Sequence, residues 1–99
     1  MIKHIVTWKL TATDDAGKTA AFEEISAALL PLAQSVPSVV SLEVGRNAAY
    51  PDTNWDIAIF AEFESIAGLE EYQVHPEHVK AAAVVRANVS ERAAIDYEV

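Results

Sequence analysis

The chain has 99 residues, of which 52% are hydrophobic, and it carries a formal net charge of −8 with no cysteine. Disulfide or thiolate chemistry is therefore excluded, and nucleic-acid binding is disfavoured because it relies on an excess of Lys and Arg. No apolar stretch approaches the roughly 20 residues of a membrane span, and no secretory signal pattern precedes the first predicted strand. We expect one cytoplasmic domain over residues 1–99, with a ligand that is neutral or apolar rather than polyanionic. The high apolar fraction in so short a chain also favours a homo-oligomer.

The opening segment 2–10 alternates in polarity and predicts a β-strand. One set of alternate residues is large and apolar apart from His4, and consists of Ile2, His4, Val6, Trp8 and Leu10. If this set faces the core, the His4 ring is buried and needs a hydrogen-bond partner. His4 is therefore either a core histidine bonded to another side chain or a residue that lines a pocket.

The next segment predicts a helix that ends before Pro37. Residues 13–15 offer capping oxygens and negative charge for its start. Its apolar residues recur at helical spacing, and they are Phe22, Ile25, Leu29, Leu32 and Val36. Pro31 removes a backbone hydrogen bond, so we expect a kink in a helix that continues past it.

The remaining segments complete the order β-α-β-β-α-β. Strands are predicted over 39–44, 55–63 and 90–99, and helical regions over 65–73 and 76–87. The loop between the second and third strands is too short for a parallel crossover, so these strands should form an antiparallel hairpin.

This order is typical of a ferredoxin-like α+β fold with an antiparallel four-stranded sheet. The helical regions cover one face of the sheet. The opposite face, which carries Ile5, Thr7, Ala58 and Phe60, is left without a helix. A second copy of the chain would cover it, which predicts a homodimer through the sheet faces, forming a dimeric α/β barrel.

A proline divides the second helical region at a segment rich in titratable rings. The residue before a proline is pushed out of the α region, so the chain should turn at His75. Pro76 suits the first position of a new helix. His78 then lies near the third position, beside unpaired amide groups, where a neutral imidazole that accepts a proton is favoured. The resulting corner has Tyr72 at one rim and His78 at the other.

Each of these rings also has a purely structural interpretation. Tyr72 would be a core residue whose hydroxyl reaches solvent, His78 would bond a local backbone group, and His75 would cap the helix. His75 and His78 stand three residues apart, but a zinc site needs three or four ligands. We therefore expect no metal site and no cofactor.

Several segments resemble the stress-responsive A/B barrel (Dabb) domain family. They are Lys3-His4-Ile5-Val6, Phe63-Glu64-Ser65, Tyr72-x-x-His75-Pro76-x-His78-Val79 and the final Ile95-Asp96-Tyr97. The resemblance covers nearly the whole chain. It implies a dimeric α+β barrel with a small cavity between each sheet and its helices.

The resemblance also implies candidate site residues. The family includes a plant polyketide cyclase, olivetolic acid cyclase, and its site residues correspond by position to Tyr72, His78 and His4. Some relatives bind magnesium through backbone carbonyls at the end of the first helix, which here would lie near Ala33, Val36 and Val39.

Three functions are open at this point. The first is a cofactor-free lyase or cyclase that acts on a small carbonyl-rich, polyketide-like compound, with Tyr72 and His78 as an acid–base pair and His4 positioning the substrate. The second is a non-catalytic, stress-associated dimer that binds a small apolar or aromatic molecule or is purely structural. The third is a haem- or quinone-directed monooxygenase-like protein or an isomerase of aromatic degradation. An open cavity of about 300 Å³ or more favours ligand binding, whereas a packed interior favours a structural dimer.

Overall fold

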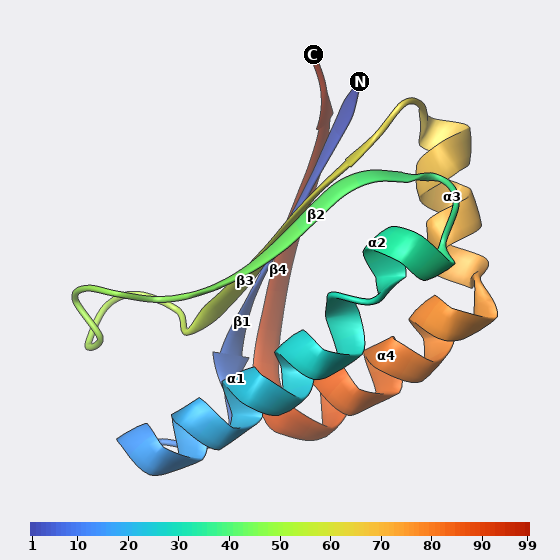
Figure 1. Cartoon of the computed structure of the whole chain (residues 1–99). Helices are drawn as coiled ribbons and strands as arrows, with labels where there is room; N and C mark the ends of the chain where they lie inside the picture. Colours follow the sequence, from blue (N-terminus) through green and yellow to red (C-terminus); the bar gives the residue numbers. More distant parts are fainter.

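The computed structural model describes residues 1–99 and has the predicted ferredoxin-like α+β fold (Figure 1). The sheet has four strands in the order β2-β3-β1-β4, and all neighbouring pairs are antiparallel. The strands are β1 (Ile2–Leu10), β2 (Val39–Arg46), β3 (Ile57–Phe63) and β4 (Val89–Glu98). The helices are α1 (Asp15–Leu29), α2 (Leu32–Ser35), α3 (Ile66–Val74) and α4 (Pro76–Asn88). None of these helices has the length and apolar character needed to cross a membrane.

The two faces of the sheet have different environments. All helices lie on one side of it (Figure 1), and β1 alternates between buried and half-buried residues along its whole length, as its sequence predicts. On the other side, Ile5 lies between Phe60 of β3 and Ile95 of β4. We call this surface the open sheet face, and its apolar and aromatic members include Ile5, Phe60, Ile95 and Tyr97. No helix covers them.

The first helical region departs from its prediction in the middle and at its start. Instead of one kinked helix, α1 ends at Leu29 and α2 begins at Leu32. The break follows from Pro31, which has no amide hydrogen to donate. Leu29, Leu32 and Val36 are nevertheless all buried, so the apolar face continues across the break. At the start of α1, the Asp14 side chain occupies the N-cap position but makes no capping hydrogen bond.

The second helical region buries Leu69, Tyr72 and Val85, but the first turn of each helix is more exposed. Ile66 of α3 and Val79 of α4 are apolar but 53% and 52% exposed. The buried residues of α4 are Ala81 and Val85. Because α4 packs against both α1 and the sheet, its inward side also carries residues that line a cavity, His78 and Ala82 among them.

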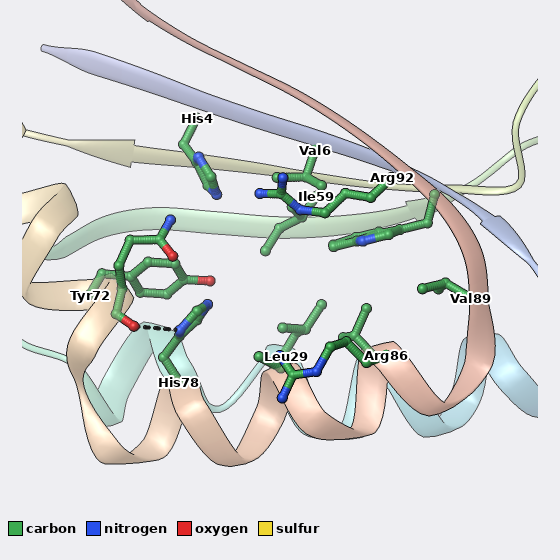
Figure 2. Close-up of a pocket in the computed structure, with 13 residues that line it drawn as sticks. His4, Val6, Leu29, Ile59, Tyr72, His78, Arg86, Val89 and Arg92 are labelled. Atoms are coloured by element: carbon green, nitrogen blue, oxygen red, sulfur yellow. Dashed lines mark hydrogen bonds between the residues drawn. The ribbon is translucent and has the colours of Figure 1, made fainter.

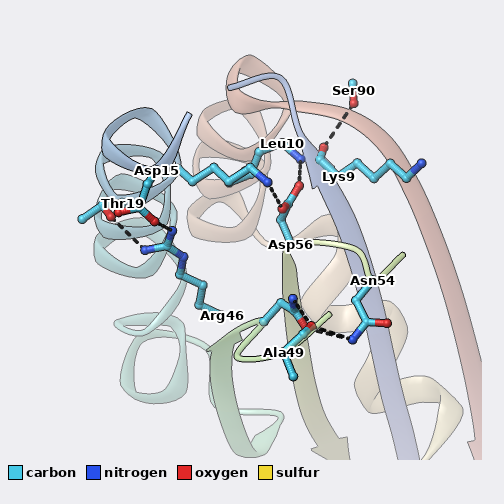
Figure 3. A network of polar contacts seen from close by, with 11 residues as sticks. Lys9, Leu10, Asp15, Thr19, Arg46, Ala49, Asn54, Asp56 and Ser90 are labelled. Atoms are coloured by element: carbon cyan, nitrogen blue, oxygen red, sulfur yellow. Dashed lines mark hydrogen bonds and ion pairs between the residues drawn. The ribbon is translucent and has the colours of Figure 1, made fainter. Parts of the chain in front are cut away.

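A polar network fastens the end of the sheet to α1 (Figure 3). One carboxylate oxygen of Asp56 accepts the Leu10 amide at 2.8 Å, and the other lies 2.8 Å from the Lys18 ammonium. Burial raises the pKa of Asp56, but the Lys18 and Leu10 hydrogen bonds outweigh it and lower the pKa overall. Asp56 thereby bridges β1 and α1. The strand β3 begins at Ile57, two residues after the predicted start at Trp55.

Candidate functional site

A cavity of about 260 Å³ lies between the sheet and the helices (Figure 2). Eight of its 13 lining residues are hydrophobic, so its walls are mostly hydrocarbon. Polar side chains enter it from α3, α4, β1 and β4. The lining residues are His4, Val6, Trp8, Leu29, Ile59, Tyr72, Gln73, His78, Ala82, Val85, Arg86, Val89 and Arg92.

The three ring side chains expected at the site meet in this cavity. The ring centroids of Tyr72 and His78 are 4.3 Å apart, and those of His4 and Tyr72 are 6.0 Å apart. The corner forms as predicted, because α3 ends at Val74 and α4 begins at Pro76. His75 caps α4, since its Nδ1 accepts the Glu77 amide at 3.1 Å. His75 therefore shapes the corner and does not line the cavity.

The backbone fixes which ring nitrogen of His78 carries hydrogen. Its Nδ1 lies 3.1 Å from the Gln73 carbonyl oxygen, and a carbonyl can only accept a hydrogen bond. In the neutral ring, Nδ1 is therefore the donor and Nε2 keeps its lone pair. The second ring nitrogen lies on the side that faces the Tyr72 hydroxyl (Figure 2). His78 thus presents a proton acceptor to the cavity.

The surroundings of His78 keep that acceptor free of a proton. Burial lowers the pKa of His78, and repulsion from His4, Arg86 and Arg92 lowers it further, while the Gln73 hydrogen bond only partly offsets these effects. A neutral imidazole was expected from the helix terminus. In the structure, burial and neighbouring cations are the main causes.

Tyr72 can act as a hydrogen-bond donor and not as a base. Its residue is 1% exposed, and burial raises the pKa of its hydroxyl to about 12. The hydroxyl therefore stays protonated near neutral pH and can donate a hydrogen bond. It points into the cavity (Figure 2).

His4 is both a core histidine bonded to another side chain and a residue that lines the cavity. It is 3% exposed, and its Nδ1 forms a hydrogen bond with the Asp96 carboxylate. Asp96 stands directly opposite His4 in the β1–β4 pairing. The carboxylate accepts the hydrogen on Nδ1, which fixes the orientation of the ring, and the ring points into the cavity (Figure 2).

Comparison with known proteins identifies the family. The "Stress responsive A/B Barrel Domain" (Dabb) profile matches residues 2–99. The chain belongs to the Dabb family. No curated protein sequence matches this Dabb domain at a significant level.

Solved structures share its fold. A dimeric protein of unknown function from Bacteroides fragilis superposes with a TM-score of 0.87 at 31% identity, covering 99% of this chain and 95% of that one. A hydroxynitrile lyase from Passiflora edulis gives a TM-score of 0.79 at 15% identity, covering 97% and 90%. An antibiotic biosynthesis monooxygenase gives 0.78 at 10% identity, covering 100% and 98%. At these low identities, the two enzymes show likeness of fold alone.

Sequence reasoning missed three polar residues of this Dabb domain. Asp96 was assigned only to a strand, because its contact with His4 depends on how β1 and β4 are aligned. Arg86 and Arg92 line the cavity, and no spacing in the sequence indicates that α4 and β4 turn both of them toward one space. Trp8, a member of the alternating set expected to face the core, lines the cavity as well.

The magnesium position of some relatives is a poor fit in this Dabb domain. The Val36 carbonyl accepts the Val39 amide at 3.1 Å, and no Asp or Glu occurs between Pro31 and Leu42. Magnesium is usually held through one or two carboxylates. No group of three or more His, Asp or Glu side chains is placed to hold a metal elsewhere, and the chemistry below uses no metal.

Proposed function

We propose that this Dabb domain is a cofactor-free lyase or cyclase that acts on a small carbonyl compound held in the cavity. One observation carries the proposal: a neutral histidine and a protonated tyrosine meet with ring centroids 4.3 Å apart, at the edge of an apolar cavity. A base and a hydrogen-bond donor at such a distance can act on one carbonyl group together.

In the proposed reaction, His78 Nε2 removes a proton from the carbon next to a carbonyl group. The C–H electrons form an enolate, and the Tyr72 hydroxyl donates a hydrogen bond to its oxygen, where the negative charge develops. The enolate carbon then attacks a second carbonyl carbon and forms a C–C bond, and His78 returns its proton to the new alkoxide. The reverse sequence breaks a C–C bond, which is a lyase reaction. His4, held by Asp96, forms a hydrogen bond with the substrate and positions it.

Proton exchange tests the first step without knowledge of the natural substrate. Acetophenone is a small aryl ketone, and deuterium uptake into its methyl group in heavy water can be followed by NMR. We expect the protein to accelerate uptake above buffer, and His78→Gln to abolish the acceleration. His75→Asn is the matched control, because it removes a histidine from the same corner while asparagine retains a capping oxygen. Uptake at the buffer rate with the unsubstituted protein would contradict the proposed chemistry.

A non-catalytic binding role is the alternative. The cavity volume of about 260 Å³ lies just below the roughly 300–1,000 Å³ of typical ligand pockets, which suits a small bound molecule whether or not it reacts. In this case acetophenone would shift the NMR signals of the Tyr72, His78 and His4 rings without any deuterium uptake.

We also propose that the protein is a homodimer assembled through the open sheet face. Ile95 and Tyr97 on this face are 59% and 41% exposed in the single chain, and exposed apolar surface of this kind favours association. The similar B. fragilis protein is described as dimeric.

A further inference from the structure

Two arginines differ from every other basic side chain in the protein. The chain has seven Lys and Arg residues and 15 Asp and Glu residues, so carboxylates are in excess. Five of the basic side chains lie within salt-bridge distance of a carboxylate, namely Lys3, Lys9, Lys18, Arg46 and Lys80. Arg86 and Arg92 have no carboxylate partner, despite the acidic surroundings.

The same two arginines line the cavity of the candidate site. Arg86 comes from α4 and Arg92 from β4, so the two are brought together by the fold and not by sequence spacing. Their side chains extend along opposite sides of the space in front of Tyr72 and His78 (Figure 2). Two carboxylates share the Arg92 side of β4: Asp96 is already bound by His4, and Glu98 lies farther along the strand, opposite Ile2. The cavity therefore has a guanidinium group at each of two sides and no carboxylate of the chain paired with either.

We propose that Arg86 and Arg92 form a carboxylate-recognition site, and that the ligand of this cavity is a small carboxylic acid with an aromatic or short aliphatic body. A guanidinium group binds a carboxylate through two parallel hydrogen bonds, which fixes both its position and its orientation. The ligand body then lies against the apolar wall that includes Val6, Leu29 and Ile59. The volume of about 260 Å³ restricts that body to roughly a single ring or a short chain.

This proposal refines the ligand expected from the sequence. The net charge of −8 argues against polyanions, but two unpaired guanidinium groups provide a local attraction for one carboxylate. The proposal rests on the proposed function only in placing the ligand in the same cavity. It can fail while the Tyr72 and His78 chemistry holds for neutral ketones, and the experiment separates these cases.

Binding of matched acid and amide pairs tests the proposal. The probes are benzoate with benzamide and hexanoate with hexanamide, because each pair differs mainly in charge. Dissociation constants are measured by NMR titration of the intact protein in low-salt buffer at neutral pH. We expect each acid to bind at least about tenfold more tightly than its amide, as for one charge-assisted contact. Added salt should reduce the difference, since both arginines are exposed at the rim.

Substitutions assign that preference to the arginines. Arg86→Gln and Arg92→Gln should each reduce the preference for the acid, and the double variant should bring the acid-to-amide ratio close to one while amide binding is retained. Lys80→Gln is the control. It removes one positive charge from the same helix at a side chain that is 74% exposed and pairs with Glu77, so the ratio should not change.

Three results would overturn the proposal. They are failure of both acids to bind at millimolar concentration, equal binding of acids and amides to the unsubstituted protein, and a preference that survives in the double variant. If the double variant instead weakens the dimer and leaves the ratio unchanged, the arginines pair with carboxylates of the partner subunit. If one of these results is obtained, deuterium uptake by acetophenone in the unsubstituted protein would show that the proposed chemistry holds without the carboxylate site.

Discussion

Replacing Asp96 with alanine removes the hydrogen-bond partner of a buried ring. The His4 side chain is 4% exposed, whereas that of Asp96 is 36% exposed. A buried donor without an acceptor costs about 1–3 kcal/mol. Water can approach from the Asp96 side once the carboxylate is gone, so we expect a loss of about 1–2 kcal/mol in the free energy of unfolding. Asp96→Asn keeps an acceptor oxygen in place and should cost about 1 kcal/mol or less.

Urea unfolding, followed by tryptophan fluorescence at pH 7, measures these losses. Protein concentration must be held constant, because association contributes to the apparent stability. Glu98→Ala is the matched control, since Glu98 lies two residues along β4 on the same side of the strand and opposite Ile2. It should change stability by less than about 0.5 kcal/mol. A loss for Asp96→Ala no larger than that of the control would show that the Asp96 carboxylate does not hold His4.

Three further predictions concern the site and the assembly. Because the pKa of His78 lies below its usual 6.5 in the folded chain, the unfolded chain takes up the proton first, so stability should fall as pH drops below about 6.5. Unfolding curves for His78→Gln should show a smaller fall, and an equal fall would contradict this assignment. Tyr72→Phe should lower the acetophenone exchange rate by about 10²–10³ with stability within about 0.5 kcal/mol, and an unchanged rate would remove Tyr72 from the chemistry. Ile95→Asp should convert dimer to monomer in analytical ultracentrifugation, whereas an intact dimer would place the interface elsewhere.

Local patterns were sufficient to predict most of the fold. The alternation of Ile2–Leu10 predicts a strand with His4 turned inward, because a half-buried strand repeats every two residues. The His75-Pro76 pair predicts the corner, because proline constrains the residue before it and suits the first helical position. Both signals depend on neighbouring residues only.

Contacts between distant segments could not be predicted in this way. The bond from His4 to Asp96 depends on the alignment of β1 with β4, and a shift of one residue would turn Asp96 to the other face. That Arg86 and Arg92 line the same cavity depends on how α4 packs against the sheet. Local sequence does not show either that Val79 lies on the exposed side of α4, because this depends on how α4 packs against α1.

The central claim is that His78 presents an unprotonated Nε2 to a cavity shared with Tyr72 and His4. A long-range ¹H–¹⁵N NMR spectrum of the histidine rings at pH 7 measures this directly. We predict a neutral His78 ring with hydrogen on Nδ1, and ring signals of His78, His4 and Tyr72 that shift together when acetophenone is added. A His78 ring protonated on both nitrogens, or carrying its hydrogen on Nε2, would leave no base in the cavity and would contradict the proposed chemistry.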